Sequence, residues 1–375
     1  MSQYKHHSAQ HMRLKLWLRA VLLLICAAGL ITPLMARATD APFTNSTSLQ
    51  QPLASEEVTD TPPVTPPSPP PVPRPPTPTP PPRPTPPPTP APVLATGISV
   101  DARELLFGKV GHRLTLQLTT RPANATRAGL SFISSNPRIA TVDAQGTVTA
   151  RGFGRCSISI RLNGRSITIP VTVARRWVAV TWDDGPGRGT AGLVRQLNQR
   201  GVRCTFFVIG RQTTSASSQR LLRTMRNTGH EVANHTWSHS TAPRTLARQL
   251  RQTDGSIRRA TGQTPRIMRP PEGRLNAAVR SCGKAVIMWS VDPMDWRNRN
   301  AATVASRITR QVRSGDIVLL HDIHASSING GLRAIDRLQA QGYAFVTVSE
   351  LLSTPRSNRV YTKGPAAVRT MKIRY

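Results

Sequence analysis

Apolar and polar residues alternate in short runs between residues 94 and 174 of the 375-residue chain. One such run contains Ile158, Ile160 and Leu162. Others contain Leu114, Leu116 and Leu118, and Ile167, Ile169, Val171 and Val173. Alternation with a period of two, broken by turn residues, is typical of antiparallel strands that bury one face. We therefore expect a small all-β sandwich here.

From residue 175 onward the pattern changes to short apolar runs that alternate with helical stretches. The apolar runs cover residues 178–181, 205–209, 285–289, 317–320 and 345–348. The helical stretches include residues 191–200, 245–261 and 301–313. This order predicts an α/β fold with a parallel sheet, which at this size can close as a barrel.

The first 38 residues have the features of an export signal. Basic residues precede an apolar stretch at 20–35, and Ala36-Arg37-Ala38 is a cleavage site of the A-x-A type. The apolar stretch is shorter than the roughly 20 residues of a typical membrane span. Cleavage of the signal and its retention as a membrane anchor through residues 14–36 both stay open.

Residues 39–93 are predicted to be a linker. The first part is polar, and prolines dominate from residue 61 to 93. Proline fixes φ and removes a backbone donor, so this tract is incompatible with a helix or a central strand. At about 3.1 Å per residue, a polyproline II spacer of this length reaches on the order of 100 Å.

The chain is strongly basic, with 50 Lys and Arg against 18 Asp and Glu and a formal charge of +32. From residue 175 onward there are 33 basic and 11 acidic residues, a net charge of 33 − 11 = +22. Such a charge favours contact with anionic polymers, although a basic surface also serves solubility alone. No basic run is interleaved with aromatic residues, so we expect no nucleic-acid partner.

The cysteines give little guidance. Cys26 lies in the leader, which leaves Cys156, Cys204 and Cys282, an odd number without CxxC spacing. Whether Cys204 and Cys282 pair, or all three remain thiols, stays open.

Reactive side chains follow the predicted strands from residue 175 onward. Asp183-Asp184, residues 269–273, residues 292–296 and His321-Asp322 each come after an apolar run. Parallel α/β folds build their active sites at the carboxyl ends of the strands. Four such clusters in order therefore predict an active site.

The residue types in these clusters suggest metal-assisted hydrolysis. His235 and His239 are four residues apart, so a helical turn would place both imidazoles on one face. With one carboxylate they would form a three-ligand site that leaves a position for water, as in catalytic zinc. In Asp183-Asp184, one carboxylate can bind the metal while the other accepts a proton from water. His321 is the candidate acid for a departing amine.

Five ordered motifs in residues 177–352 resemble those of the polysaccharide deacetylase family (carbohydrate esterase family four). They are residues 181–186, 235–239, 269–273, 292–296 and 319–322. The resemblance implies a distorted (β/α) barrel. It also implies removal of N-acetyl groups from peptidoglycan, chitin or related polymers, or of O-acetyl groups from xylan.

The resemblance assigns roles to individual residues. The metal ligands would be Asp184, His235 and His239. Asp183 would be the base, held in place by Arg269, and His321 the acid, with Asp295 as its partner. The backbone amide of Glu272 would stabilise the oxyanion, while Trp296 and Leu319 would wall the pocket for the acetyl methyl group.

Two positions depart from the family pattern. Trp182 replaces the usual Phe, which predicts a volume change beside the base, and Glu272 replaces an aromatic or small residue. Both put substrate preference in doubt, and His324 has no assigned role. None of the five residues Asp183, Asp184, His235, His239 and His321 is lost, which argues against a degenerate, purely wall-binding barrel.

Residues 134–150 resemble the group 2 bacterial immunoglobulin-like domain. We therefore predict a signal or anchor at 1–38, a linker at 39–93, an immunoglobulin-like spacer or wall-adhesion module at 94–174, a catalytic domain at 175–352 and a basic tail at 353–375.

The expected function is metal-dependent N-deacetylation of an amino-sugar polymer, with peptidoglycan N-acetylglucosamine as first choice. The alternatives are a chitooligosaccharide deacetylase and an O-acetyl xylan esterase. We expect Zn²⁺, with Co²⁺ or another divalent ion possible. The expected location is outside the cytoplasm, either periplasmic, in the cell envelope, secreted or anchored to the inner membrane.

Overall fold

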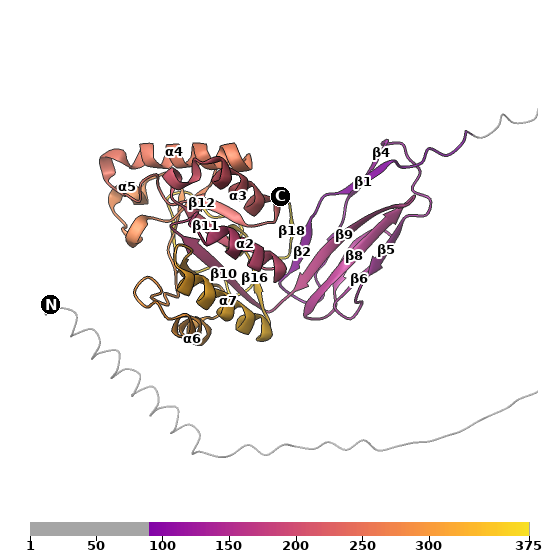
Figure 1. The fold of residues 1–375 in the computed structure, drawn as a ribbon. Coiled ribbons are helices and arrows are strands. Elements are labelled where there is room, and N and C mark those ends of the chain that lie inside the picture. Colours follow the sequence, from indigo (N-terminus) through magenta and orange to yellow (C-terminus); the bar gives the residue numbers. More distant parts are fainter. Residues whose placement is uncertain (1–89, 375) are drawn as a thin grey trace, which may run out of the picture. The chain divides into compact units, whose positions relative to one another are not determined.

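A computed structural model describes residues 90–374 of the chain (Figure 1). The predicted signal or anchor and nearly all of the predicted linker lie outside the described residues. Within the described part, no helix is both long enough and apolar enough to span a membrane.

The first described part is all β, as predicted. Its largest sheet has the order β18-β2-β9-β8-β5, beside a three-stranded sheet β3-β7-β6 and the pair β1-β4. The strands are β1 Gly97–Val100, β2 Glu104–Phe107, β3 Arg113–Thr115, β4 Leu118–Arg121, β5 Ser131–Ser134, β6 Ala140–Val142, β7 Thr147–Ala150, β8 Gly154–Leu162, β9 Arg165–Val173 and β18 Met371–Ile373.

The alternating residues of β8 and β9 form the core of this part. Ile158, Ile160 and Leu162 are fully buried, and successive residues of a strand point to opposite faces. The run from Leu114 to Leu118 is divided between β3 and β4, which belong to different sheets.

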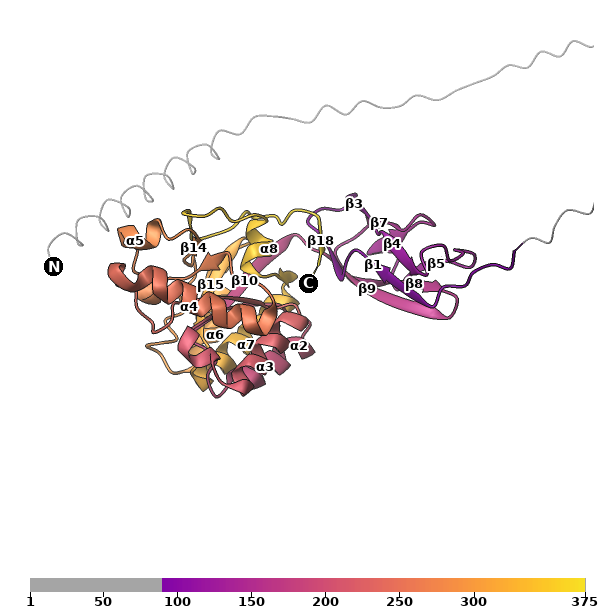
Figure 2. The ribbon, with the colours of Figure 1, turned by 90° about the horizontal axis from the view of Figure 1, so that it is seen from above.

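The second part is a curled parallel sheet with helices packed against it, which confirms the predicted distorted barrel (Figures 1 and 2). The strand order is β15-β10-β11-β12-β13-β14-β17, and β16 also pairs with β10. The strands are β10 Arg176–Asp183, β11 Thr205–Val208, β12 Glu231–Asn234, β13 Ile267–Met268, β14 Ala285–Ile287, β15 Asp316–His321, β16 Tyr343–Phe345 and β17 Val360–Tyr361. The helices are α2 Thr190–Gln199, α3 Ala216–Asn227, α4 Pro243–Thr261, α5 Ala277–Arg280, α6 Ala301–Gln311, α7 Ala325–Ala340 and α8 Val348–Leu352.

Strand β10 separates two cores. Val178, Val180 and Trp182 pack with residues of α2, α6 and α7 on the outer face of the sheet. Trp177 and Ala179 pack in the core on the opposite face. Because side chains alternate along a strand, Asp183 points to the inner face, at the carboxyl end of β10.

The expected strand at residues 345–348 is wrong after its first residue. Strand β16 ends at Phe345, and α8 begins at Val348. Thr347 and Glu350 form a capping box, in which each side chain accepts a hydrogen bond from the backbone of the other. This cap satisfies backbone groups at the start of a helix, so the apolar run turns into α8.

Residues beyond Leu352 contribute a strand to each part. Strand β17 extends the parallel sheet next to β14. Strand β18 pairs antiparallel with β2, and Ile373 is buried. Near this pairing, Arg203 forms ion pairs with Glu104 of β2 at 3.1 Å and with Glu350 of α8 at 2.6 Å.

Candidate metal centre and active site

Three predicted metal ligands converge at the carboxyl end of the sheet. Oδ1 of Asp184 lies 3.3 Å from Nε2 of His235 and 3.3 Å from Nε2 of His239. One donor atom from each residue lies within 4.8 Å of the other two. Asp184 directly follows β10 and His235 directly follows β12, so parallel strands bring together residues that are distant in sequence.

The expected helical turn at His235 and His239 is wrong. Both residues lie in a loop between β12 and α4, and Thr236 and His239 have positive φ values of 64° and 60°. The side chain of Asn234 accepts a hydrogen bond from the backbone N–H of Thr236 at 2.8 Å. This local turn competes with helix formation, and the two imidazole rings still approach to 5.2 Å between centroids.

The hydrogen bonds of these residues fit a bound cation. Nδ1 of His235 lies 2.8 Å from the carbonyl oxygen of Arg269, so Nδ1 carries the proton and Nε2 presents a lone pair towards Asp184. Oδ1 of Asp184 is buried, and no hydrogen-bond donor reaches it. Three electron-rich atoms thus face one point, which is the donor set of a divalent metal site.

Asp183 forms a buried ion pair with Arg269. Nη1 of Arg269 donates to Oδ1 of Asp183 at 2.7 Å, and its Nη2 donates to the carbonyl of Met288 at 2.9 Å. The guanidinium also lies over the ring of Phe207, with Cζ 4.3 Å from its centroid. Arg269 is fully buried, so one carboxylate oxygen of Asp183 is fixed in position.

His321 and Asp295 form a second pair beside Asp183. Nδ1 of His321 lies 3.0 Å from Oδ1 of Asp295, and the backbone N–H of His321 donates to Oδ2 at 2.9 Å. His321 is the register partner of Asp183 in the neighbouring strand. Burial lowers the pKa of His321, but the hydrogen bond and charge of Asp295 outweigh burial and raise it to about 9.

The remaining predicted site residues differ in exposure. Leu319 is buried in β15, whereas Trp296 is 50% exposed. Glu272 has a φ of 55°, and its carboxylate pairs with Nε of Arg274 at 2.6 Å.

Trp182 does not change the volume beside the base, contrary to the expectation from the sequence. Its indole lies in the outer core, where a Cβ on Gly331 would lie 2.5 Å from its ring. A glycine in α7 thus accommodates the larger ring, on the face of the sheet opposite to Asp183.

Asp322 contacts the loop that follows Asp184, an arrangement that sequence reasoning missed. Its Oδ2 accepts the hydroxyl of Thr190 at 2.6 Å, and that hydroxyl oxygen accepts the backbone N–H of Gly187 at 2.8 Å. A Cβ on Gly185 would clash with Oδ2 of Asp322. The carboxyl group of Asp322 therefore packs directly under the loop that follows Asp184. Asp184 itself has a positive φ of 74°. Burial raises the pKa of Asp322 to about 7.

Cys156, Cys204 and Cys282 are free thiols.

Two family models match the chain. The model for polysaccharide deacetylases matches residues 171–287, and the model for the intimin immunoglobulin-like domain matches residues 121–174. The second match supports the immunoglobulin-like character of the first part.

Curated relatives match about half of the chain. A peptidoglycan-N-acetylglucosamine deacetylase of Bacillus cereus is 33% identical over 199 residues, which are 50% of this chain and 92% of that protein. PgdA of Listeria monocytogenes, a peptidoglycan-N-acetylglucosamine deacetylase, is 34% identical over 189 residues, 49% of this chain and 40% of that protein. PdaC of Bacillus subtilis, a peptidoglycan-N-acetylmuramic acid deacetylase, is 36% identical over 180 residues, 46% of this chain and 38% of that protein. The chain thus spans less than half the length of the last two relatives.

Among solved structures, a family 4 acetyl xylan esterase from Clostridium thermocellum in complex with a cobalt ion has a TM-score of 0.48. It is 30% identical, and the match covers 51% of this chain and all of that one. With the Bacillus cereus relative covered almost completely, the chain belongs to the polysaccharide deacetylase family. This family consists of metal-dependent enzymes.

Proposed function

We propose that this protein is a metal-dependent hydrolase that removes N-acetyl groups from peptidoglycan, with N-acetylglucosamine as the first-choice sugar. One observation carries the proposal: the Asp184, His235 and His239 cluster lies beside both the Asp183–Arg269 pair and the His321–Asp295 pair. The names of the relatives from Listeria monocytogenes and Bacillus cereus support the choice of polymer.

Asp184, His235 and His239 would hold the metal, which we propose to be Zn²⁺. When bound, such an ion lowers the pKa of a water molecule towards neutrality and polarises a carbonyl group. Asp183, held by Arg269, accepts the proton of the attacking water. His321, oriented by Asp295, donates a proton to the departing amine, because an unprotonated amine is a poor leaving group.

Further residues would contact the substrate. We assign Trp296 and Leu319 to the walls of the acetyl methyl pocket, and the backbone amide of Glu272 to the carbonyl oxygen. The 50% exposure of the Trp296 side chain supports a place where a polymer can reach it.

The proposal extends to the organisation of the whole chain. Residues 175–352 would form the catalytic domain, with residues 94–174 as a spacer or wall-adhesion module. The basic residues and apolar stretch before Ala38 support an exported protein of the cell envelope, cleaved or held at the inner membrane.

Acetate release from a small panel of polymers tests the proposal. We expect purified full-length protein with added Zn²⁺ or Co²⁺ to release acetate from peptidoglycan. Mass spectrometry of the digested product would show whether N-acetylglucosamine or N-acetylmuramic acid has lost its acetyl group. Release from acetylated xylan alone, or from chitin oligomers alone, would contradict the choice of substrate.

A further inference from the structure

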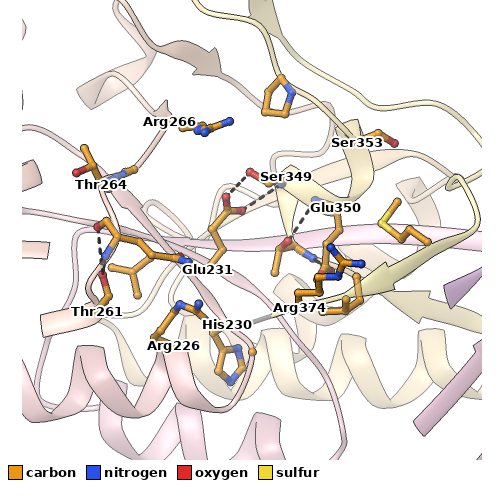
Figure 3. A pocket seen from close by; sticks show the side chains of 18 of the residues that line it. Arg226, His230, Glu231, Thr261, Thr264, Arg266, Ser349, Glu350, Ser353 and Arg374 are labelled. Atoms are coloured by element: carbon orange, nitrogen blue, oxygen red, sulfur yellow. Dashed lines mark hydrogen bonds between the residues drawn. The ribbon is translucent and has the colours of Figure 1, made fainter. Parts of the chain in front are cut away.

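A large cavity lies at the amino end of strands β12, β13 and β14 (Figure 3). Its volume is about 1370 Å³, and its wall includes Glu231 at the start of β12, Arg266 just before β13 and Lys284 just before β14. His235 follows the other end of β12. A strand of this length spans roughly 13 Å, at about 3.3 Å per residue. The cavity and the metal-ligand cluster therefore lie at opposite ends of the sheet.

Cationic side chains dominate the wall of this cavity. Five cations line it, against the two carboxylates of Glu231 and Glu350. The cations are Arg226, Arg266, Lys284, Lys372 and Arg374.

Both carboxylates are turned towards the protein. Glu231 accepts the hydroxyl of Thr205 at 2.9 Å and the backbone N–H of Ser349 at 3.2 Å, and Glu350 pairs with Arg203 at 2.6 Å. Burial raises the pKa of both groups, that of Glu350 to about 7. The two carboxylates are thus used inside the fold. Lys284 is itself paired with Asp254 at 2.7 Å, so the positive charge that the cavity presents comes mainly from the arginines and Lys372.

One guanidinium group of the cavity wall is available to a ligand, and a second is partly engaged. Arg266 is exposed, and its guanidinium has no hydrogen-bond or ion-pair partner among residues 90–374. Arg374 is also exposed. Its Nε donates to the carbonyl oxygen of Asp101 at 2.9 Å, and it shares the carboxylate of Asp101 with Lys372, at 3.2 and 2.5 Å. One carboxylate between two cations leaves positive charge uncompensated.

The rest of the wall favours a charged ligand over a neutral sugar. No Phe, Tyr or Trp is among the described residues that line the cavity, so a sugar ring has no aromatic surface to pack on. Hydroxyl groups of Thr264, Ser353 and Ser357 accompany the cations. A guanidinium binds a carboxylate through two parallel hydrogen bonds, which gives strength and orientation.

We infer that this cavity binds the peptide stems of peptidoglycan through their carboxylates, as a second contact separate from the deacetylation site. The identity of the polymer rests on the proposed function. Binding of a peptide stem in the cavity holds the attached glycan near the protein. This raises the effective concentration of glycan at the metal site, although the metal site itself gains no contact. The cavity would thus favour stem-bearing peptidoglycan over uncharged glycans.

Charge reversal of Arg266 tests this inference. Full-length protein carrying Arg266→Glu should bind soluble, stem-bearing peptidoglycan fragments about tenfold more weakly, as expected for the loss of one charge-assisted hydrogen bond. The dependence of binding on salt concentration should also become shallower. Titration calorimetry at two salt concentrations measures both effects.

Arg220→Glu is the matched control, because Arg220 is an exposed arginine of α3 outside this cavity. It should leave fragment binding unchanged, and both variants should release acetate normally from short neutral N-acetylglucosamine oligomers. Equal weakening by the two substitutions would overturn the inference in favour of unspecific charge. A competition experiment gives a second test. If polyphosphate displaces the fragment better than polyglutamate of equal charge does, the cavity does not prefer carboxylates and the inference is overturned. If wild-type protein binds the fragments but releases no acetate from any polymer, the proposed function fails while the cavity assignment stands.

Discussion

The two ends of the parallel sheet carry opposite charges. Six of the eleven acidic residues that follow residue 174 lie at or after the carboxyl ends of strands, namely Asp183, Asp184, Glu272, Asp292, Asp295 and Asp322. At the amino end, five cations surround the cavity and both carboxylates face inward. In a part of the chain with a net charge of +22, the few acids are concentrated where a cation fits. A single charge average therefore conceals two sites with opposite ligand preferences.

The largest effect is expected from Asp184→Asn at the carboxyl end. It removes one of three ligands, so metal affinity and turnover should both fall by about 10³-fold or more, beyond the 10–100-fold typical of residues that only orient a ligand. Metal content after dialysis and acetate release measure the two quantities. Asp336→Asn, on the exposed side of α7, is the control and should change neither. An Asp184→Asn protein that keeps its metal would contradict the ligand assignment.

Asp183→Asn should separate proton transfer from metal binding. The variant should keep the metal but lose about 10²–10⁴ in rate, as is typical when a general base is removed. Metal content after dialysis and acetate release measure the two effects. If Asp183→Asn loses the metal and Asp184→Asn retains it, the two roles are exchanged, and if both variants stay active the site lies elsewhere.

Asp322→Asn should have a smaller effect, because Asp322 acts through the loop after Asp184. An amide retains the shape but weakens the 2.6 Å hydrogen bond from Thr190, so metal affinity should fall about 10-fold, within the range for orienting residues. Titration of metal-free protein with Co²⁺ measures the affinity. Thr190→Ser, which keeps the hydroxyl, should remain close to wild type. An unchanged dissociation constant in Asp322→Asn would show that the loop is held by other contacts.

The smallest expected effect is a displacement of the pH profile. If His321 is the acid that we propose, activity should decline as pH rises through its pKa of about 9. A bound divalent cation opposes the charges of Asp183 and Asp184, which places this decline below pH 9 in the metal-loaded enzyme. Asp295→Asn removes the main group that raises the pKa, so the decline should move to lower pH. Profiles of kcat/KM against pH for wild type and Asp295→Asn test this. Coincident profiles would show that the pairing with Asp295 does not raise the pKa of His321.

The candidate site residues at the carboxyl end of the sheet could be predicted from the sequence, because they lie in short motifs that follow strands with a clear apolar pattern. The loop conformation at His235 could not, since the Asn234 turn and two positive φ values leave no periodic pattern. The partner of Asp322 lies 132 residues away in Thr190, and no local spacing links them. The same holds for the amino-end cavity, which is assembled from single residues beside several strands and helices.

The pairing of β18 with β2 has a consequence for synthesis. Between Val173, the end of β9, and Met371 the ribosome must add the whole parallel sheet, which at typical elongation rates takes on the order of 10–40 s. During that time one edge of β2 has no partner, while β9 already occupies the other. An open edge invites pairing with other strands, so the nascent chain passes through a period in which its first domain is nearly complete and still open to aggregation.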